Sequence, residues 1–220
     1  MEVGKINNVT IERTPSGKYF VVLNVDFEPT PNLNKGGSIG IDVGIKDFYS
    51  DSNGNVVHNP KYLEKSMRKL IREQRKLSRK QKGSNNRNKQ RIKVALVHEK
   101  ITNQRNDFLQ KQSTMLVREN QTICIEDLNV KGMMKNKHLS EKIKEAKFYE
   151  FRRQLEYKCK WNNVNLIIAD RWYPSSKLCS SCGNRKKKLS LSERIYVCEE
   201  CGCVIDRDYN ASLNLKYLAM

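Results

Sequence analysis

Apolar residues alternate with polar ones in the first part of the chain. Residues 9–28 contain two alternating runs on either side of Thr-Pro-Ser-Gly at residues 14–17, so they predict a β-hairpin whose second strand is the more apolar. A linker rich in Pro, Asn and Gly follows at residues 29–37. Residues 38–59 then predict a buried strand, a second strand and a tight turn at residues 53–54.

The middle of the chain changes to helical spacing. Between residues 62 and 119 apolar side chains recur every three to four positions, with one break at Gly-Ser-Asn-Asn, residues 83–86. This pattern predicts two long helices that form a hairpin. The remaining predicted elements are a strand at residues 121–130, an amphipathic helix at 141–162, a strand at 164–173 and a closing helix at 209–220.

Positive charge is concentrated in the predicted helical hairpin. The formal net charge is +18, and residues 61–118 hold 18 Lys and Arg against four Asp and Glu, so 14 of the net positive charges lie there. Such density indicates contacts with the phosphates of a polyanion rather than an ordinary solvated surface. The residues expected to make these contacts are Arg68, Lys69, Arg72, Arg75, Lys76, Arg79, Lys80, Arg87, Arg91 and Arg105.

No stretch of the sequence has the character of a membrane span or a signal peptide. A run of eighteen apolar residues does not occur, and Met1 is not followed by an apolar core. The sequence therefore predicts no membrane partner and a reducing, intracellular setting. In that setting, most of the seven cysteines are expected to bind metal.

Four cysteines near the C-terminus have the spacing of a metal site. Cys179 and Cys182 form one CxxC pair and Cys198 and Cys201 a second, fifteen residues apart, which is typical of a zinc ribbon. Four thiolates complete a tetrahedral shell and leave no position for a catalytic water, so the zinc is predicted to be structural. Cys203 is interpreted as unligated, with a substitute ligand as the alternative.

Three acidic residues occupy positions where an isolated carboxylate is costly. Asp42 lies within the apolar segment IGIDVG, Glu126 ends the apolar segment TICIE, and Asp208 lies where the predicted ribbon meets the final helix. Together they can converge at one sheet edge and hold two hard divalent ions. Singly, each has a structural alternative, because Asp42 could cap a turn, Glu126 could pair with a lysine and Asp208 could be an N-cap.

The order of motifs resembles that of a known family. The segments GIDVG, the basic stretch that begins RKLIREQRKLSRKQKG, ICIEDLNVKGM, DRWYPSSKLCSSCG and CGCVIDRDYNASLN are similar to the C-terminal half of the transposon-encoded TnpB proteins, relatives of the type V CRISPR effector nucleases. The resemblance runs from about residue 38 to the end. It implies a RuvC-like, RNase H-like α/β fold with a mixed sheet, and RNA-guided, metal-dependent cleavage of DNA in the prokaryotic cytoplasm, at the nucleoid.

The resemblance also assigns site residues. By position, Asp42 matches the first catalytic carboxylate and Glu126 the second, and the family's DRDxNA motif offers Asp208 or Asp206 as the third. Asp208 is preferred because it directly precedes the closing helix, and Asp206 is held in reserve. These carboxylates are expected to bind two Mg²⁺ ions. Arg207, between the two acids, either contacts the scissile strand or offsets their charge.

The family pattern divides the chain as well. Residues 1–37 correspond to a β-hairpin remnant of an oligonucleotide-binding barrel plus linker. The nuclease domain takes residues 38–174 and 204–220, with the basic hairpin 61–119 inserted, and the zinc ribbon takes residues 175–203. In the family an N-terminal half carries most of that barrel and a helical lobe, which grip guide RNA and inspect target DNA, and beyond the hairpin the sequence is expected to lack them.

Two function classes follow from this departure. The first is a DNA endonuclease that is truncated, split or minimal, with DNA and guide RNA as its partners and, for a split protein, a separately encoded N-terminal half. The second is an accessory module that binds nucleic acid without cutting it. The label transposase attaches to such mobile-element proteins, but the sequence contains no tyrosine-recombinase or similar strand-transfer constellation.

Overall fold

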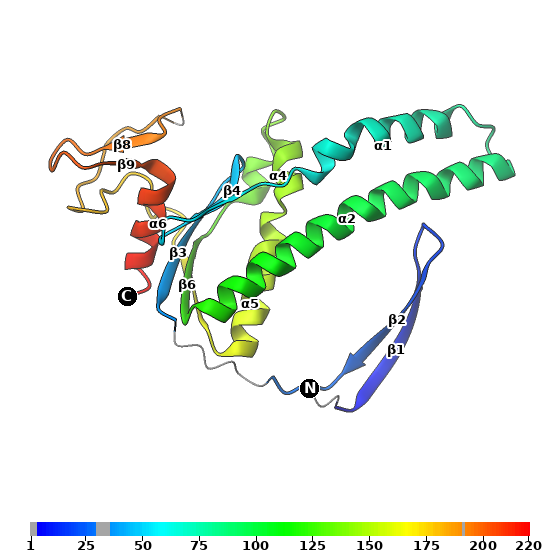
Figure 1. Cartoon of the computed structure of the whole chain (residues 1–220), viewed down its shortest axis with the longest axis horizontal. Helices are drawn as coiled ribbons and strands as arrows, with labels where there is room; N and C mark the ends of the chain where they lie inside the picture. Colours follow the sequence, from blue (N-terminus) through cyan, green and yellow to red (C-terminus); the bar gives the residue numbers. More distant parts are fainter. Residues whose placement is uncertain (1–3, 30–35, 191) are drawn as a thin grey trace. The chain divides into compact units, whose positions relative to one another are not determined.

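The structure, a computed structural model, describes residues 4–29, 36–190 and 192–220 (Figure 1). The chain divides into two compact units. The first comprises Met1–Thr30 and Lys61–Phe108, and the second comprises Pro31–Pro60 and Leu109–Met220. Most of the predicted linker at residues 29–37 lies outside the described residues.

The first unit begins with the predicted β-hairpin. Strands β1 (Ile6–Arg13) and β2 (Tyr19–Val25) pair antiparallel, and Gly17 in the turn adopts a positive φ of 92° that favours glycine. The apolar side chains of both strands are exposed. They are Ile6, Val9, Ile11, Tyr19, Phe20, Val21, Val22 and Leu23. Since neighbouring residues of a strand point to opposite faces, the hairpin presents apolar groups on both faces.

The helical hairpin follows the predicted pattern. Helix α1 (Tyr62–Ser78) and the long helix α2 (Asn85–Glu119) pack through Leu70, Val97 and Ile101. The link between the helices covers residues 79–84, so it begins earlier than the predicted break at 83–86. The last turns of α2 belong to the second unit.

A mixed five-stranded sheet is the centre of the second unit. Its order is β5 (Val56–His58), β4 (Asp47–Asp51), β3 (Ser38–Val43), β6 (Thr122–Glu126) and β7 (Asn165–Ala169). Strands β3, β6 and β7 are parallel, whereas β4 runs antiparallel to both of its neighbours, β3 and β5. The mixed α/β sheet predicted from the sequence is therefore confirmed.

Helices cover the sheet on both faces. Helix α5 (Phe148–Asn162) packs its Phe151 ring against the rings of Phe48 and Tyr49, with centroid distances of 4.9 Å and 6.2 Å. Helix α6 (Arg207–Tyr217) lies along β3, as Figure 1 shows. A separate two-stranded sheet, β8 (Ile195–Val197) and β9 (Val204–Asp206), belongs to the cysteine-rich segment.

The single helix predicted at residues 141–162 is wrong. Lys147 adopts a left-handed conformation, with φ 52° and ψ 43°, and separates α4 (Ser140–Ala146) from α5. Ala146 and Phe148 are both buried, although they are only two residues apart. One continuous helix does not place residues at this spacing on one face, so a break between them allows both to be buried. The strand predicted at 164–173 also ends early, at Ala169.

One short helix has no counterpart in the sequence prediction. Helix α3 (Val130–Met133) begins at Asn129, whose side chain accepts a hydrogen bond from the Gly132 amide. Within the described residues, no helix has the length and apolar character needed to cross a bilayer.

Candidate active site and metal centre

Asp42 and Glu126 lie on neighbouring parallel strands. The register of β3 and β6 pairs Gly40 with Cys124 and Ile41 with Ile125, so Asp42 and Glu126 follow in step at the carboxyl ends of the two strands. Side chains alternate between sheet faces. Because Cys124 packs against Leu215 of α6, Glu126 two residues later belongs to the face that α6 covers.

Gly40 allows α6 to approach the sheet closely. A Cβ atom at Gly40 would lie 2.0 Å from the Ser212 carbonyl oxygen and 2.4 Å from the Lys216 amide nitrogen. Any larger side chain would force strand and helix apart. Asp42 is two residues from Gly40 on the same face, and Asp208 lies one turn before Ser212. The close packing therefore brings the start of α6 to Asp42.

The two acids of the DRDxNA motif have different surroundings. Asp206 is the N-cap of α6, and its Oδ1 accepts hydrogen bonds from the amides of Asp208, at 3.0 Å, and Tyr209, at 2.9 Å. Asp208 lies in the first turn, where its carboxylate accepts from Arg207 Nη2 at 3.0 Å and lies 3.9 Å from Arg194 Nη1. Helix capping thus accounts for Asp206 alone.

The three carboxylates act on one another electrostatically. Burial and the negative charges of Glu126 and Asp208 hold the pKa of Asp42 well above its usual range, and Arg207 opposes this rise. The pKa of Glu126 is also raised, by burial and by Asp208. Like charges held this close favour either protonation or a bound cation.

Ser175 contacts Glu126 and was not identified from the sequence. Its hydroxyl donates a hydrogen bond to Glu126 Oε1. The Ser175 carbonyl in turn accepts from Asn214 Nδ2 at 2.7 Å, so α6 holds the loop that carries the serine. No sequence signal identifies this contact, because it depends on Asn214, a polar residue whose burial in α6 is seen only in the structure.

The donor chemistry of this site fits a hard divalent cation. Carboxylate oxygens are the ligands that Mg²⁺ prefers. Within the described ranges, however, the four cysteines are the only group of three or more His, Cys, Asp or Glu whose ligand atoms all lie within 4.8 Å of one another. The ligand atoms of the three carboxylates therefore do not all lie within 4.8 Å of one another.

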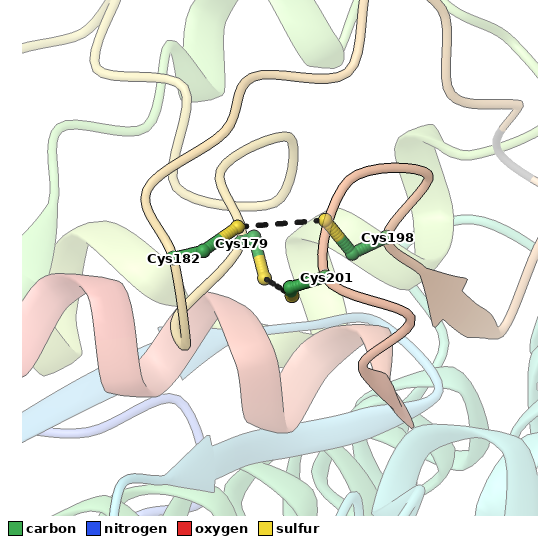
Figure 2. Close-up of side chains that lie close together, drawn as sticks. All are labelled: Cys179, Cys182, Cys198 and Cys201. Carbon is green, nitrogen blue, oxygen red and sulfur yellow. Dashed lines mark hydrogen bonds between the residues drawn. The ribbon is translucent and has the colours of Figure 1, made fainter.

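The four predicted cysteines converge from two turns, as Figure 2 shows. The sulfur of Cys179 lies 3.6 Å from that of Cys201, and the sulfur of Cys182 lies 3.6 Å from that of Cys198. A tetrahedron with Zn–S bonds of about 2.3 Å has S–S edges of about 3.8 Å. The cluster therefore fits a zinc ribbon.

The two cysteine turns repeat one backbone pattern. In the first, the Gly183 amide donates to the Cys179 carbonyl at 2.8 Å and the Cys179 amide donates to the Asn184 carbonyl at 2.9 Å. In the second turn, Gly202, Cys198 and Cys203 make the corresponding bonds. Cys203 thus occupies the position of Asn184, which explains why it lies outside the four-thiol cluster.

Backbone amides prepare one thiol for metal. Hydrogen bonds from the backbone amide of Cys201, which has the larger effect, and from that of Glu200 lower the pKa of Cys198 to about 6. A lowered pKa favours the thiolate, which is the form that binds metal.

The predicted phosphate-binding residues differ in their surroundings. Arg72 and Lys76 contact the buried Glu73, at 3.1 Å and 3.4 Å. Arg87 donates to the carbonyls of Leu77, at 2.9 Å, and Lys80, at 3.0 Å, and so caps the end of α1. The side chains that are exposed on the hairpin are Arg68, Lys69, Arg72, Arg75, Lys76, Arg79 and Arg91, whereas Lys80, Arg87 and Arg105 are half-buried.

Comparison with known proteins agrees with these features. A family model described as "Probable transposase" matches residues 18–137, and a second, the TNB domain of Cas12f1-like proteins, matches residues 148–215. A Streptomyces pristinaespiralis protein named "Putative RNA-guided DNA endonuclease" is 47% identical over 94% of the chain and 51% of its own length. The TnpB-like protein L79 of Acanthamoeba polyphaga mimivirus is 31% identical over 94% of the chain and 42% of its own length.

Solved structures show the same fold. A chain in the cryo-EM structure of a Cas12f1–sgRNA–target DNA complex superposes with a TM-score of 0.56 at 19% identity, covering 94% of this chain and 55% of that one. The chain spans about half the length of the relatives that it matches. With a family model that covers more than half of its residues, the chain belongs to the OrfB_IS605 family of transposon-encoded TnpB proteins.

Proposed function

We propose that the chain is the RuvC-like nuclease part of an RNA-guided DNA endonuclease. The observation that carries the proposal is the meeting of Asp42, Glu126 and Asp208 on one face of the sheet, from β3, β6 and α6. Carboxylates placed against a polyanionic ligand weaken its binding. A module that only binds nucleic acid would therefore gain nothing from them, whereas a metal-dependent nuclease needs them. The relatives named as RNA-guided DNA endonucleases support the same reading.

The chain's residues take distinct parts in this mechanism. Asp42, Glu126 and Asp208 would hold two Mg²⁺ ions, which when bound activate water and stabilise the leaving 3′ oxygen in phosphodiester hydrolysis. Ser175 fixes the orientation of Glu126 through its hydroxyl. Asp206 fixes the first turn of α6, which carries Asp208. Arg207 contacts Asp208 and offsets part of the acidic charge near the DNA strand.

The cysteine cluster has a structural part in the same proposal. Cys179, Cys182, Cys198 and Cys201 would bind one zinc ion with a closed shell of four thiolates. Asn210 links this segment to α6, because its amide donates to the Leu178 carbonyl at 2.6 Å and its oxygen accepts from the Ser180 amide at 2.9 Å. The metal would therefore stabilise the start of the helix that carries Asp208.

The basic hairpin is the proposed contact surface for nucleic acid phosphates. Its exposed cations, Arg68, Lys69, Arg75, Arg79 and Arg91, are placed to release counterions from a duplex or guide RNA. Arg87 is assigned to helix capping instead, because its guanidinium bonds two carbonyls of the α1 terminus. Neutralising Arg87 should lower the stability of the hairpin and leave the salt dependence of binding unchanged.

The β1–β2 hairpin supports a polypeptide partner. Ile11 and Val21, neighbours in the register, are 73% and 64% exposed, and apolar side chains occupy both faces. An isolated two-stranded hairpin is at best marginally stable in water. We assign it to an incomplete barrel that an N-terminal half, encoded in the same or another chain, would complete.

Carboxylate substitutions test the proposal. Asp42→Ala, Glu126→Gln and Asp208→Asn should each reduce Mg²⁺-dependent DNA cleavage by more than about a thousandfold, without additive losses in combination, because each removes a ligand of the same site. Asp206→Asn is the matched control. It removes the same charge but keeps a good N-cap, so cleavage should persist.

The assay measures cleavage of DNA by the chain, with and without a co-expressed N-terminal half and its co-purifying RNA. Binding is measured in parallel by fluorescence anisotropy. If the unsubstituted chain with these partners and Mg²⁺ binds DNA but leaves it intact, the nuclease proposal is wrong and the non-cleaving binding module takes its place. If Asp206→Asn loses cleavage and Asp208→Asn stays active, Asp206 is the third metal ligand and Asp208 is not.

A further inference from the structure

A pocket of about 460 Å³ lies beside Glu126 in the second unit. Part of its wall is apolar and comes from Val43 and Ile125, which point to the sheet face opposite Glu126, and from Phe148 and Phe151 of α5, while Lys131 and Glu156 are among its charged lining residues. Its volume falls within the range of about 300–1,000 Å³ that is typical of small-ligand sites. The pocket is therefore large enough for one nucleotide and adjoins a carboxylate of the proposed active site.

Two arginines line the same pocket and both contact Asp127, and Arg152 also donates to Glu156 Oε1 at 2.9 Å. Asp127 accepts from Arg152 Nη1 at 2.6 Å and from Arg171 Nη2 at 2.5 Å. The side chains of Arg152 and Arg171 remain 35% and 46% exposed, so part of each guanidinium can reach a ligand. A guanidinium presents its donors in a planar fork that matches the oxygens of a phosphate.

An aromatic side chain completes the rim. Tyr149 lines the pocket, follows the buried Phe148 in the first turn of α5 and is 72% exposed. A ring in this position can stack on a nucleobase, and base stacking on aromatic side chains tolerates any base. The pocket thus combines an apolar wall, a stacking ring and two phosphate-binding cations.

We propose that this pocket, which meets the proposed active site at Glu126, binds one nucleotide of the single-stranded DNA substrate. The base stacks on Tyr149 and the apolar wall, and the phosphate is bound by Arg171 and Arg152. The inference rests on the proposed nuclease function, since it takes the strand to pass Glu126. It adds a subsite that sets the position of the strand.

Asp127 separates this arrangement from a simple basic surface. Asp127→Asn removes a negative charge from the DNA path, so on a diffuse basic surface DNA would bind more tightly. If Asp127 instead holds the two arginines in place, the same substitution should weaken binding about threefold to tenfold, because the guanidiniums lose their fixed geometry. A diffuse basic surface and an ordered arginine pair therefore predict opposite changes in the DNA affinity of Asp127→Asn.

The experiment uses the full chain with an Asp42→Ala substitution, so that the DNA stays intact. Affinity for a short single-stranded DNA is measured by anisotropy, and 5-iododeoxyuridine at each position of the strand is cross-linked and mapped by mass spectrometry. Tyr149→Ala and Arg171→Gln should each weaken binding about tenfold. Cross-links to Tyr149 should come from one nucleotide position. Lys160→Gln, an exposed charge at the far end of the same helix, should change affinity less than twofold.

The outcomes separate the subsite from the nuclease. Unchanged affinity in Tyr149→Ala and Arg171→Gln, tighter binding in Asp127→Asn, or a chain that binds no single-stranded DNA overturns the subsite. Failure of the nuclease proposal appears elsewhere, as intact DNA in cleavage assays of the chain that retains Asp42. Circular dichroism of each variant checks that the fold is kept.

Discussion

The cysteine cluster and the carboxylate site are built in opposite ways. Each pair of thiols comes from one short turn, and the same two backbone hydrogen bonds shape both turns. The carboxylates come from β3, β6 and α6, so their proximity depends on strand register and on the close packing at Gly40. A locally built site should tolerate changes in the core. A site assembled from distant segments should be sensitive to any shift between them.

The largest effect is expected from Cys198→Ser. Three remaining ligands hold structural zinc on the order of a hundredfold or more weaker than four, so the protein should lose its zinc. Cleavage should fall as well, because β9 ends at Asp206, the N-cap of α6. Elemental analysis measures the zinc, and hydrogen exchange should show loss of protection in residues 178–206 but not in β3 and β6.

The dependence should run in one direction only. Asp42→Ala should abolish cleavage while the protein keeps its full zinc content, since no carboxylate contributes to the cysteine turns. Full zinc content in Cys198→Ser, or zinc loss in Asp42→Ala, would remove the distinction between the two sites.

Gly40→Ala should damage the carboxylate site alone. The new methyl group would lie 2.0 Å from the Ser212 carbonyl oxygen, so α6 must move away from β3. Overpacking of this kind costs about 1–3 kcal/mol of folding stability, and a shift of about 1 Å in a catalytic group costs roughly a hundredfold in rate. Chemical denaturation and cleavage rates measure both.

Gly37→Ala is the matched control for Gly40→Ala, because a Cβ at Gly37 would meet no atom within 4 Å. Its stability and cleavage rate should stay close to those of the unsubstituted chain. Equal losses in the two variants would mean that the effect comes from the strand backbone and not from the contact with α6.

Ser175→Ala should have a smaller effect at the same site. It removes the hydroxyl that donates to Glu126 and leaves the carboxylate in place, so cleavage should fall roughly tenfold to a hundredfold, as expected for a hydrogen bond to a charged group. Zinc content should be unchanged. Ser175→Thr should restore most of the rate, and Ser176→Ala should be neutral. A rate unaffected by Ser175→Ala would show that Glu126 is oriented by other contacts.

The smallest effect concerns the basic hairpin. There Glu73 of α1 accepts a hydrogen bond from Gln90 of α2 and so links the two helices without a metal. Side-chain hydrogen bonds lower the pKa of Glu73 from 4.5 to about 2. The bond from Gln90 has the largest effect, and those from Arg72 and Lys76 have smaller ones. Because the folded-state pKa is below the unfolded value, the stabilisation by Glu73 is full above pH 4.5 and is lost as the pH falls towards 2. Glu73→Gln should remove this acid dependence from the hydrogen exchange of α1, and an unaltered pH profile would contradict the assignment.

The sequence predicted those parts of the molecule that depend on neighbouring residues. The CxxC spacing identified the cysteine cluster, and the apolar segments around Asp42 and Glu126 identified their strands. The break at Lys147 was missed because the overall apolar spacing resembles one helix, and only burial of Phe148 reveals the change of face. The assignments of the catalytic and phosphate-binding residues remain predictions.

Other features could not be predicted because they arise between distant segments. The importance of Gly40 depends on α6, and the contact of Ser175 with Glu126 depends on a loop held by Asn214. The pocket beside Glu126 combines strand ends with the first turns of α5. None of these has a spacing signature, since no fixed separation along the chain determines them.

The position of α6 in the chain has a consequence for biosynthesis. A ribosome releases β3 and β6 well before α6, and domains tend to fold as they emerge. Asp42 and Glu126 can therefore reach their places in the sheet during translation, whereas Asp208 arrives only after the cysteine-rich segment has been made. A nascent chain that stalls before α6 would therefore lack one of the three carboxylates of the proposed site.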